Sequence, residues 1–196
     1  MCIRDRIWRS YPEYREECPA KFLIPVFLEL FDGQIKKNDR VIDFGCGTGA
    51  FTKFLLEKKL KVYLIDISEN SLDPEIFLLS LKDDVDFSKA CLWNLPDSIQ
   101  AAEWVLCFDV MEHISEEKVN AVLESISQRM RVGGLLSLSL IPDQFGKGGR
   151  RSSSLHSQDE QLVEKRLDQH FSIHREFSVG NDQLIVSLLR LTSPSI

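Results

Sequence analysis

The sequence predicts an α/β domain in which strands alternate with helices. The first observation is VIDFGCGTG at 41–49, an apolar run that ends in an acid and leads into three alternate glycines. It is typical of a buried strand, a tight turn and a helix start, because glycine lets the backbone adopt positive φ angles. The second observation is that short apolar runs recur between amphipathic segments. The third is a pair of strand-like runs at 171–179 and 183–191, joined by Gly-Asn-Asp, which predicts a closing antiparallel hairpin.

The first half of the chain predicts a helix before the first strand and one after it. Apolar side chains at 22, 23, 26, 27, 30 and 31 predict a helix over 19–31, in which Pro25 would kink the helix or delay its start. The glycine turn leads into a helix expected over 48–59. Further strands are expected near 61–66, 86–92 and 103–108.

The second half continues the alternation. An amphipathic helix is expected over 115–130, because Ser115 followed by two glutamates suits a helix N-terminus. Gly133 and Gly134 are expected to end this helix, so that 135–141 forms the fifth strand. A last helix is expected over 158–170, ahead of the hairpin.

Two acids at the ends of the first two strands indicate the kind of ligand. Asp66 ends the run KVYLID and lies 23 positions after Asp43, a spacing expected for a carboxylate that accepts hydrogen bonds from a ribose diol. Asp43 stands two residues before the first glycine, where it would repel a dinucleotide pyrophosphate and could hold an ammonium. Asp43 therefore favours S-adenosylmethionine over NAD, although Gly45, Gly47 and Ala50 also fit the looser dinucleotide pattern.

Five segments of the chain, in the same order, resemble the class I S-adenosylmethionine-dependent methyltransferases. They are VIDFGCGTG, VYLIDIS, ACLWNLP, WVLCFDVMEHI and RVGGLLSLSLIP, of which the first and fourth are specific in combination. The resemblance implies a Rossmann-like fold with a seven-stranded, mostly parallel sheet in the order 3-2-1-4-5-7-6, strand 7 antiparallel, between layers of helices. It also implies one methyltransferase domain over 19–196, preceded by a segment, 1–18, that could fold over the site as a lid.

The resemblance further implies S-adenosylmethionine as cofactor and gives each strand end a role. Asp43 and the glycine backbone would hold the methionine end, Asp66 would hold the ribose hydroxyls, and Ile67 would lie on the adenine face. Family members often carry an acid near the end of strand three, where this chain has Cys91, so adenine is left to backbone groups there. Trp93 would pack beside adenine or belong to the core. The implied cofactor-binding residues are Asp43, Gly45, Cys46, Gly47, Gly49, Asp66, Ile67, Cys91, Leu92 and Phe108.

DVMEHI at 109–114 follows the fourth strand, where the methyl group should face its acceptor. If it begins a helical turn, Asp109, Glu112 and His113 converge on one face. The segment resembles the acid-x-x-Glu-His of ubiquinone-pathway O-methyltransferases and small-RNA 2′-O-methyltransferases, some of which use a metal. Three roles stay open. The first is a divalent metal site with His156 as a further ligand, which is not favoured. The second is a catalytic role, in which His113 acts as general base or orients the acceptor. The third is structural hydrogen bonding.

Two segments are candidates for acceptor binding. Tyr11, Tyr14 and Arg15 lie in the aromatic and charged segment before the first helix, and they would contact the acceptor or serve packing. Arg150 lies in GKGGRR, the one locally basic stretch, which would hold an anionic substrate group or form a solvated loop. The expected function is methyl transfer to a small-molecule or sugar acceptor, at oxygen. A non-catalytic S-adenosylmethionine-binding module and a NAD-binding oxidoreductase are the alternatives.

Composition agrees with one globular domain. The chain has 196 residues, 43% of them hydrophobic, and a net charge of −6, which gives no general attraction to duplex nucleic acid. Five cysteines without a CxxC pair suit a reducing compartment, and no apolar run reaches the length of a membrane span, so cytoplasmic residence is expected. The sequence does not indicate an oligomeric state. Residues 1–6, MCIRDR, resemble translated sequencing adapter, and on that interpretation they are not native.

Overall fold

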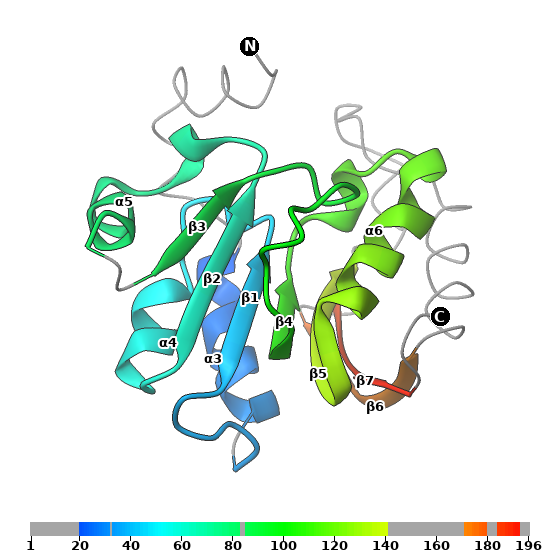
Figure 1. The fold of residues 1–196 in the computed structure, drawn as a ribbon. Coiled ribbons are helices and arrows are strands. Elements are labelled where there is room, and N and C mark those ends of the chain that lie inside the picture. Colours follow the sequence, from blue (N-terminus) through cyan, green and yellow to red (C-terminus); the bar gives the residue numbers. More distant parts are fainter. Residues whose placement is uncertain (1–19, 32, 83–84, 141–170, 180–183, 193–196) are drawn as a thin grey trace, which may run out of the picture.

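The chain forms a twisted seven-stranded sheet with helices on both faces (Figure 1). The computed structural model describes residues 20–31, 33–82, 85–140, 171–179 and 184–192. The strands are β1 (Arg40–Phe44), β2 (Lys61–Asp66), β3 (Asp86–Lys89), β4 (Ala102–Cys107), β5 (Met130–Leu140), β6 (Phe171–Val179) and β7 (Leu184–Leu191). The helices are α3 (Ala20–Phe31), α4 (Thr52–Glu57), α5 (Pro74–Ser80) and α6 (Glu116–Gln128), with 3₁₀ turns η1 (Glu69–Ser71) and η2 (Met111–His113). No helix of this described part is long and apolar enough to cross a membrane.

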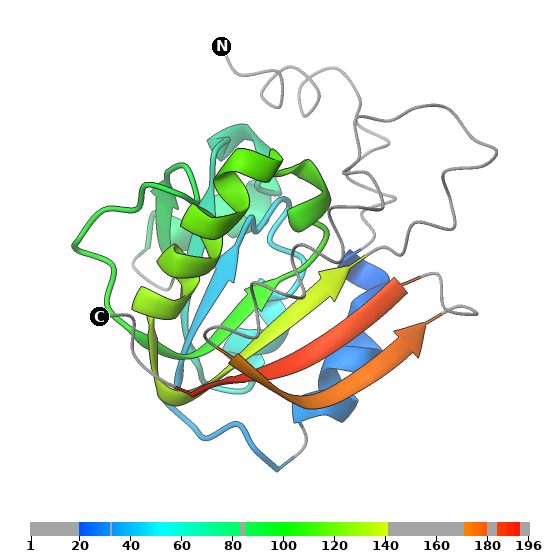
Figure 2. The ribbon, with the colours of Figure 1, turned by 90° about the vertical axis from the view of Figure 1, so that its right-hand side faces the viewer.

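The sheet has the order β3-β2-β1-β4-β5-β7-β6, which confirms the order that the resemblance implies. Strands β1 to β5 pair in parallel, and β7 runs antiparallel to both β5 and β6. Figure 2 shows the β6–β7 hairpin at the edge of the sheet. Because β1 and β4 are neighbours, the chain direction across the sheet reverses between them, and their carboxyl ends form the switch point at which α/β sheets bind ligands.

Each face of the sheet has its own core. One face buries Phe27 of α3, Leu55 of α4 and Ile76 of α5 against alternate residues of the strands. The other buries one side of α6, including Val122 and Ile126. These clusters explain the alternation along β1, where Val41 faces the first core and Ile42 the second. Side chains two residues apart on a strand point to the same face. Asp43 follows Val41 by two residues and Asp66 follows Leu64 by two, so both acids point to the face that α3 and α4 cover.

Two helix predictions need correction. The helix after the glycine turn covers Thr52–Glu57 only, because the left-handed Gly49 keeps the preceding residues in a turn. Pro25 lies inside α3, which begins at Ala20 and is not delayed. The remaining strands and α6 agree with their predicted ranges to within a few residues, apart from β5. The helix predicted over 158–170 lies outside the described residues.

The prediction that Gly133 and Gly134 end the helix is wrong. Helix α6 ends at Gln128, and both glycines lie inside β5. A Cβ on Gly134 would lie 2.7 Å from the carbonyl oxygen of Arg131 and 3.0 Å from that of Glu103. The register of β4 with β5 shifts at this point, so the glycines accommodate an irregularity between strands.

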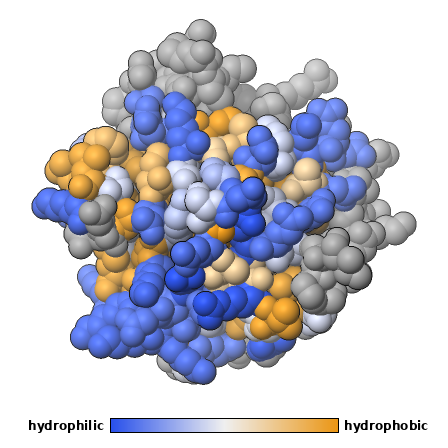
Figure 3. All heavy atoms as spheres, in the orientation of Figure 1, coloured by the Kyte–Doolittle hydropathy of each residue, from blue (hydrophilic) through white to orange (hydrophobic). Residues whose placement is uncertain are grey.

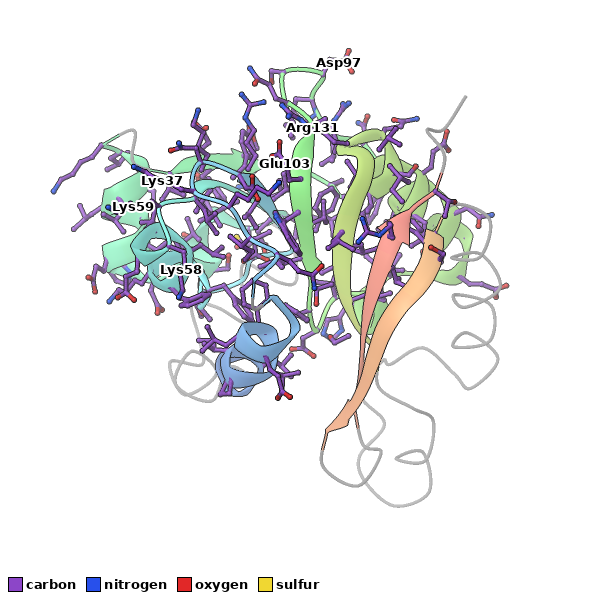
Figure 4. All side chains as sticks on the ribbon, turned by 90° about the horizontal axis from the view of Figure 1, so that it is seen from below. Lys37, Lys58, Lys59, Asp97, Glu103 and Arg131 are labelled. Atoms are coloured by element: carbon purple, nitrogen blue, oxygen red, sulfur yellow. The ribbon has the colours of Figure 1, made fainter. Side chains whose placement is uncertain are left out.

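Among the described residues, an apolar area and a group of lysines lie on the surface. An apolar area covers the α5 side of the molecule (Figure 3), where Phe77, Leu78 and Leu81 are exposed. Seen from the amino ends of the strands, Lys37, Lys58 and Lys59 lie near one another, apart from Glu103 and Arg131 (Figure 4). A hydrogen bond from the Asn38 N–H to the Lys59 carbonyl (3.0 Å) joins these two turns. The stretch at 146–151 is therefore not the only concentration of basic residues.

Candidate functional site

Glycines with a left-handed backbone form the turn between β1 and α4. Gly45, Gly47 and Gly49 have φ angles of 73°, 52° and 76°. A Cβ on Gly45 would lie 2.5 Å from Cγ2 of Val110, and a Cβ on Gly49 would lie 2.9 Å from Cγ2 of Ile76. Gly45 and Gly49 therefore accept no side chain without movement. The turn presents bare backbone at the carboxyl end of β1, next to the switch point.

Asp66 ends β2 and ties the glycine turn to the loop that follows β2. Its Oδ2 accepts the Gly47 N–H at 3.0 Å, and its Oδ1 accepts the Ser68 N–H at 2.8 Å. The side chain is largely buried, so these bonds fix the orientation of the carboxylate. Because a carboxylate has about four acceptor positions, each oxygen can also accept a hydroxyl of a ribose.

Asp43 is a second buried acid at the same edge of the sheet. It is 4% exposed and lies near the carboxyl end of β1, between Leu64 of β2 and Leu106 of β4. Burial, reinforced by the negative charge of Asp66, raises the pKa of Asp43 to about 7. Burial and the same two acids also raise the pKa of the Cys46 thiol, which is part of the core on the α3 and α4 face. Two buried acids beside open backbone suit a cationic group and disfavour a pyrophosphate.

The residues assigned to adenine lie on the loops after β2 and β3. The Ala90 N–H donates to the Asp66 carbonyl (2.9 Å), which joins the two loops. Ile67 and Cys91 are half-buried, while Leu92 is buried in the α6-side core. Trp93 packs against that core, with the Lys118 ammonium 6.0 Å from the ring centroid. The packing role that the sequence left open for Trp93 thus has direct support.

Phe108 lies beneath the glycine turn as part of an aromatic cluster. Its ring stacks on Phe51, with centroids 5.0 Å apart and planes 24° apart. Phe27 of α3 meets both rings edge-on. Phe108 is buried, so its clearest role is to support the turn that Phe51 continues.

The segment after β4 differs from the helical turn considered for it. Asp109 has a φ of 55° and lies before η2, so the i, i+3, i+4 geometry of an α-helix does not begin there. Met111 is fully buried and His113 is exposed, while the side chain of Glu112 is outside the description. Val110 packs on Gly45, which brings this segment against the glycine turn.

One residue at this edge has no counterpart among the predicted site residues. Ser139 of β5 is 1% exposed, and its Oγ accepts the Asp109 N–H at 2.8 Å. The available signal was the pattern LLSLSL at 135–140, which places two serines on one face of an otherwise apolar strand.

Several predicted residues cannot be placed. Tyr11, Tyr14, Arg15, Arg150 and His156 lie outside the described residues. Within the described ranges, no group of three or more histidine, cysteine, aspartate or glutamate side chains is arranged to hold a metal ion.

Comparison with known sequences finds one family. The family model described as a methyltransferase domain matches residues 11–181. A ubiquinone biosynthesis O-methyltransferase of Dechloromonas aromatica is 25% identical over 142 residues, 71% of this chain and 59% of that protein. A protein of the same name from Idiomarina loihiensis is 25% identical over 145 residues, 71% of this chain and 57% of that protein. The chain thus spans less than two thirds of the length of these relatives.

Solved structures agree in fold. A protein from Pyrococcus horikoshii superposes with a TM-score of 0.74 at 17% identity, covering 95% of this chain and 99% of that one. The magnesium protoporphyrin IX methyltransferase of Synechocystis, solved with bound S-adenosylmethionine, gives a TM-score of 0.71 at 18% identity, covering 97% and 96%. At these identities the likeness shows the fold alone.

Proposed function

The chain belongs to the class I S-adenosylmethionine-dependent methyltransferase family, and from this premise we propose that it transfers a methyl group from S-adenosylmethionine to an oxygen atom of a small molecule. The observation that carries the proposal is Asp43, an acid that is buried beside a glycine turn and close to the negative charge of Asp66. A buried carboxyl in this state is stabilised by a cation.

The residues present fit the cofactor. Asp43 would hold the ammonium of its methionine end, directly or through water, and the glycine backbone would allow a close approach. Asp66, already oriented by Gly47 and Ser68, would accept the ribose hydroxyls. Ile67 and the backbone near Cys91 would flank adenine, because both loops adjoin Asp66. NAD would instead bring a pyrophosphate to the glycine turn beside Asp43.

Oxygen is proposed as the acceptor atom because the two curated relatives are named O-methyltransferases. A phenol is the first acceptor class to test, since a phenolic hydroxyl loses its proton more readily than a sugar hydroxyl and needs only a weaker base. Sugar hydroxyls are the second class. The acidic chain, with its charge of −6, gives no reason to propose duplex nucleic acid.

In the proposed mechanism, residues 109–113 receive the acceptor at the carboxyl end of β4. S-adenosylmethionine, held by Asp43 and Asp66, would supply the methyl group on its sulfonium, with neutral S-adenosylhomocysteine as the leaving group. His113 would take the acceptor's proton as the carbon–oxygen bond forms, and Asp109 and Glu112 would orient the imidazole or the acceptor. Most of the rate would come from orientation and from exclusion of water.

The test is a turnover assay with S-adenosylmethionine and a panel comprising catechol, glucose and a primary amine. Release of S-adenosylhomocysteine together with a methylated catechol or sugar, identified by mass, supports the proposal. Methylation of the amine alone would contradict the oxygen assignment. Binding of S-adenosylhomocysteine without turnover of any acceptor would favour a non-catalytic module.

A further inference from the structure

The backbone at Asp109 adopts a conformation that a side chain disfavours. Asp109, with φ of 55°, is one of three non-glycine residues with positive φ among the residues that the structure describes. The other two, Asn38 and Lys59, lie in exposed turns at the amino ends of the strands. Asp109 instead follows β4 at the ligand-binding edge. Such a conformation persists only where the surroundings impose it, and it is common where function needs a fixed geometry.

A side chain of the neighbouring strand provides the contact that imposes this conformation. Backbone pairing between β4 and β5 runs to Cys107 and Leu138 and includes no later pair. One residue further along β5, the Ser139 Oγ accepts the Asp109 N–H at 2.8 Å. The buried hydroxyl thus replaces the backbone partner that the chain loses as it leaves the strand.

The same segment is held from the opposite side. Val110 packs so closely on Gly45 that a Cβ there would lie 2.5 Å from Val110 Cγ2. Residues 109 and 110 therefore lie between the glycine turn of β1 and the serine of β5. A substitution of Ser139 would therefore act on the segment 109–113 and leave the side chains of Asp43 and Asp66 unchanged.

We propose that Ser139 is a positioning residue for methyl transfer, which holds Asp109 in its left-handed conformation and thereby sets the segment 109–113 against the cofactor turn. The inference rests on the proposed function. Ser139 touches neither reactant in this role, because it acts through the Asp109 backbone. Its loss should therefore lower kcat while leaving cofactor affinity nearly unchanged.

Ser137 offers a matched control. It lies on the same face of β5, two residues earlier, and is equally buried, but its Oγ has no hydrogen-bond partner. Ser137→Ala therefore removes a hydroxyl from the same environment without removing a contact to Asp109. Ser139→Thr keeps the accepting hydroxyl and suits a strand, so it serves as the rescue variant.

The experiment has one arm on the protein alone. Amide hydrogen exchange at Asp109, measured by NMR without cofactor, should accelerate roughly tenfold or more in Ser139→Ala, and remain unchanged in Ser137→Ala and Ser139→Thr. Thermal unfolding establishes that each variant is folded. Unchanged exchange in Ser139→Ala would overturn the proposal.

The second arm measures kcat with whichever acceptor of the panel the wild type methylates. Ser139→Ala should lower kcat roughly 10- to 100-fold, with the Kd for S-adenosylhomocysteine within about twofold of wild type. In an Asp109→Gly background the same change should have a smaller effect on kcat, because glycine adopts the left-handed conformation without the Ser139 contact. Wild-type kcat in Ser139→Ala, or full additivity with Asp109→Gly, would overturn the inference alone. A wild type inactive on every acceptor would instead remove the proposed function, and this inference with it.

Discussion

The carboxylate of Asp66 accepts the backbone N–H of Gly47 at 3.0 Å, across the gap between the first two strand ends. The acid expected to bind the cofactor is therefore also a structural partner of the turn that receives it. Its second oxygen, bonded to the Ser68 N–H at 2.8 Å, fixes the loop after β2 as well. Binding and folding are coupled at this residue, and a substitution there should affect both.

Replacing Asp66 by alanine should weaken S-adenosylhomocysteine binding roughly 10- to 100-fold, because charge-assisted hydrogen bonds to the ribose are lost. It should also lower the free energy of unfolding by about 1–3 kcal/mol, since the N–H groups of Gly47 and Ser68 lose their acceptor. Calorimetric titration and urea unfolding measure the two effects. Asp86→Ala, at an exposed acid of β3, is the control. Unchanged affinity in Asp66→Ala would refute the ribose assignment.

Replacing Gly45 by alanine should cost more stability than replacing Gly33. Both glycines have a φ of 73°, but a Cβ at Gly33 meets nothing within 4 Å, while a Cβ at Gly45 meets Val110. Gly33→Ala should thus report the backbone cost of about 1–2 kcal/mol, and Gly45→Ala should add about 1–3 kcal/mol for overpacking. Urea unfolding compares them, and Gly45→Ala combined with Val110→Ala should recover part of the difference. Equal losses of unfolding free energy in the two single variants would show that the contact with Val110 adds no cost at Gly45.

The raised pKa of Asp43 predicts a pH dependence of stability. The ordinary pKa of this carboxyl is 3.8, and in the folded protein it is about 7. Between these values the folded state binds more protons than the unfolded state, so the contribution of Asp43 to stability falls as the pH rises from about 4 to 7. Asp43→Asn resembles the protonated acid. It should therefore come closest to the wild type at about pH 4 or below, exceed it increasingly as the pH rises, and exceed it at pH 8 by about 4 kcal/mol. Urea unfolding of both proteins at each pH provides the test, and a variant with the wild-type pH profile would count against the buried acid.

Replacing His113 by alanine should lower kcat roughly 100-fold or more without changing cofactor affinity, because the imidazole is proposed to act on the acceptor's proton. The side chain is exposed, so the fold should tolerate its loss. Steady-state kinetics and calorimetric titration separate the two effects. Lys118→Ala, five residues later in the first turn of α6, controls for a change of surface charge. Parallel losses of turnover and cofactor binding would indicate a structural role for His113.

The sequence predicted those parts of the fold that depend on local pattern. The run at 61–66 is a strand with a short, continuous apolar stretch, and the run at 171–179 is a strand in which apolar and polar residues are interspersed. The run at 171–179 and the strand-like run that follows it pair antiparallel as predicted. The strand order came from the resemblance to a family, since no local signal specifies which strands are neighbours. The residues outside the described ranges, Tyr11 and Arg150 among them, keep their sequence-based predictions.

The errors share a physical cause, which is contact between distant segments. Gly133 and Gly134 fit a helix stop locally, yet both lie in β5, and a Cβ on Gly134 would lie 3.0 Å from the Glu103 carbonyl oxygen in the neighbouring strand. Asp109 was placed by helical spacing, but its N–H donates to Ser139, 30 residues later. Neither effect can be derived from periodicity, because each depends on the pairing of β4 with β5.

The most direct test of the central claim is a pair of calorimetric titrations of the purified chain, one with S-adenosylhomocysteine and one with NAD. The account predicts binding of S-adenosylhomocysteine that Asp66→Ala weakens, and no binding of NAD, because Asp43 would face its pyrophosphate. Binding of NAD without binding of S-adenosylhomocysteine would contradict the account, because the account rests on the interpretation of the two buried acids beside the glycine turn.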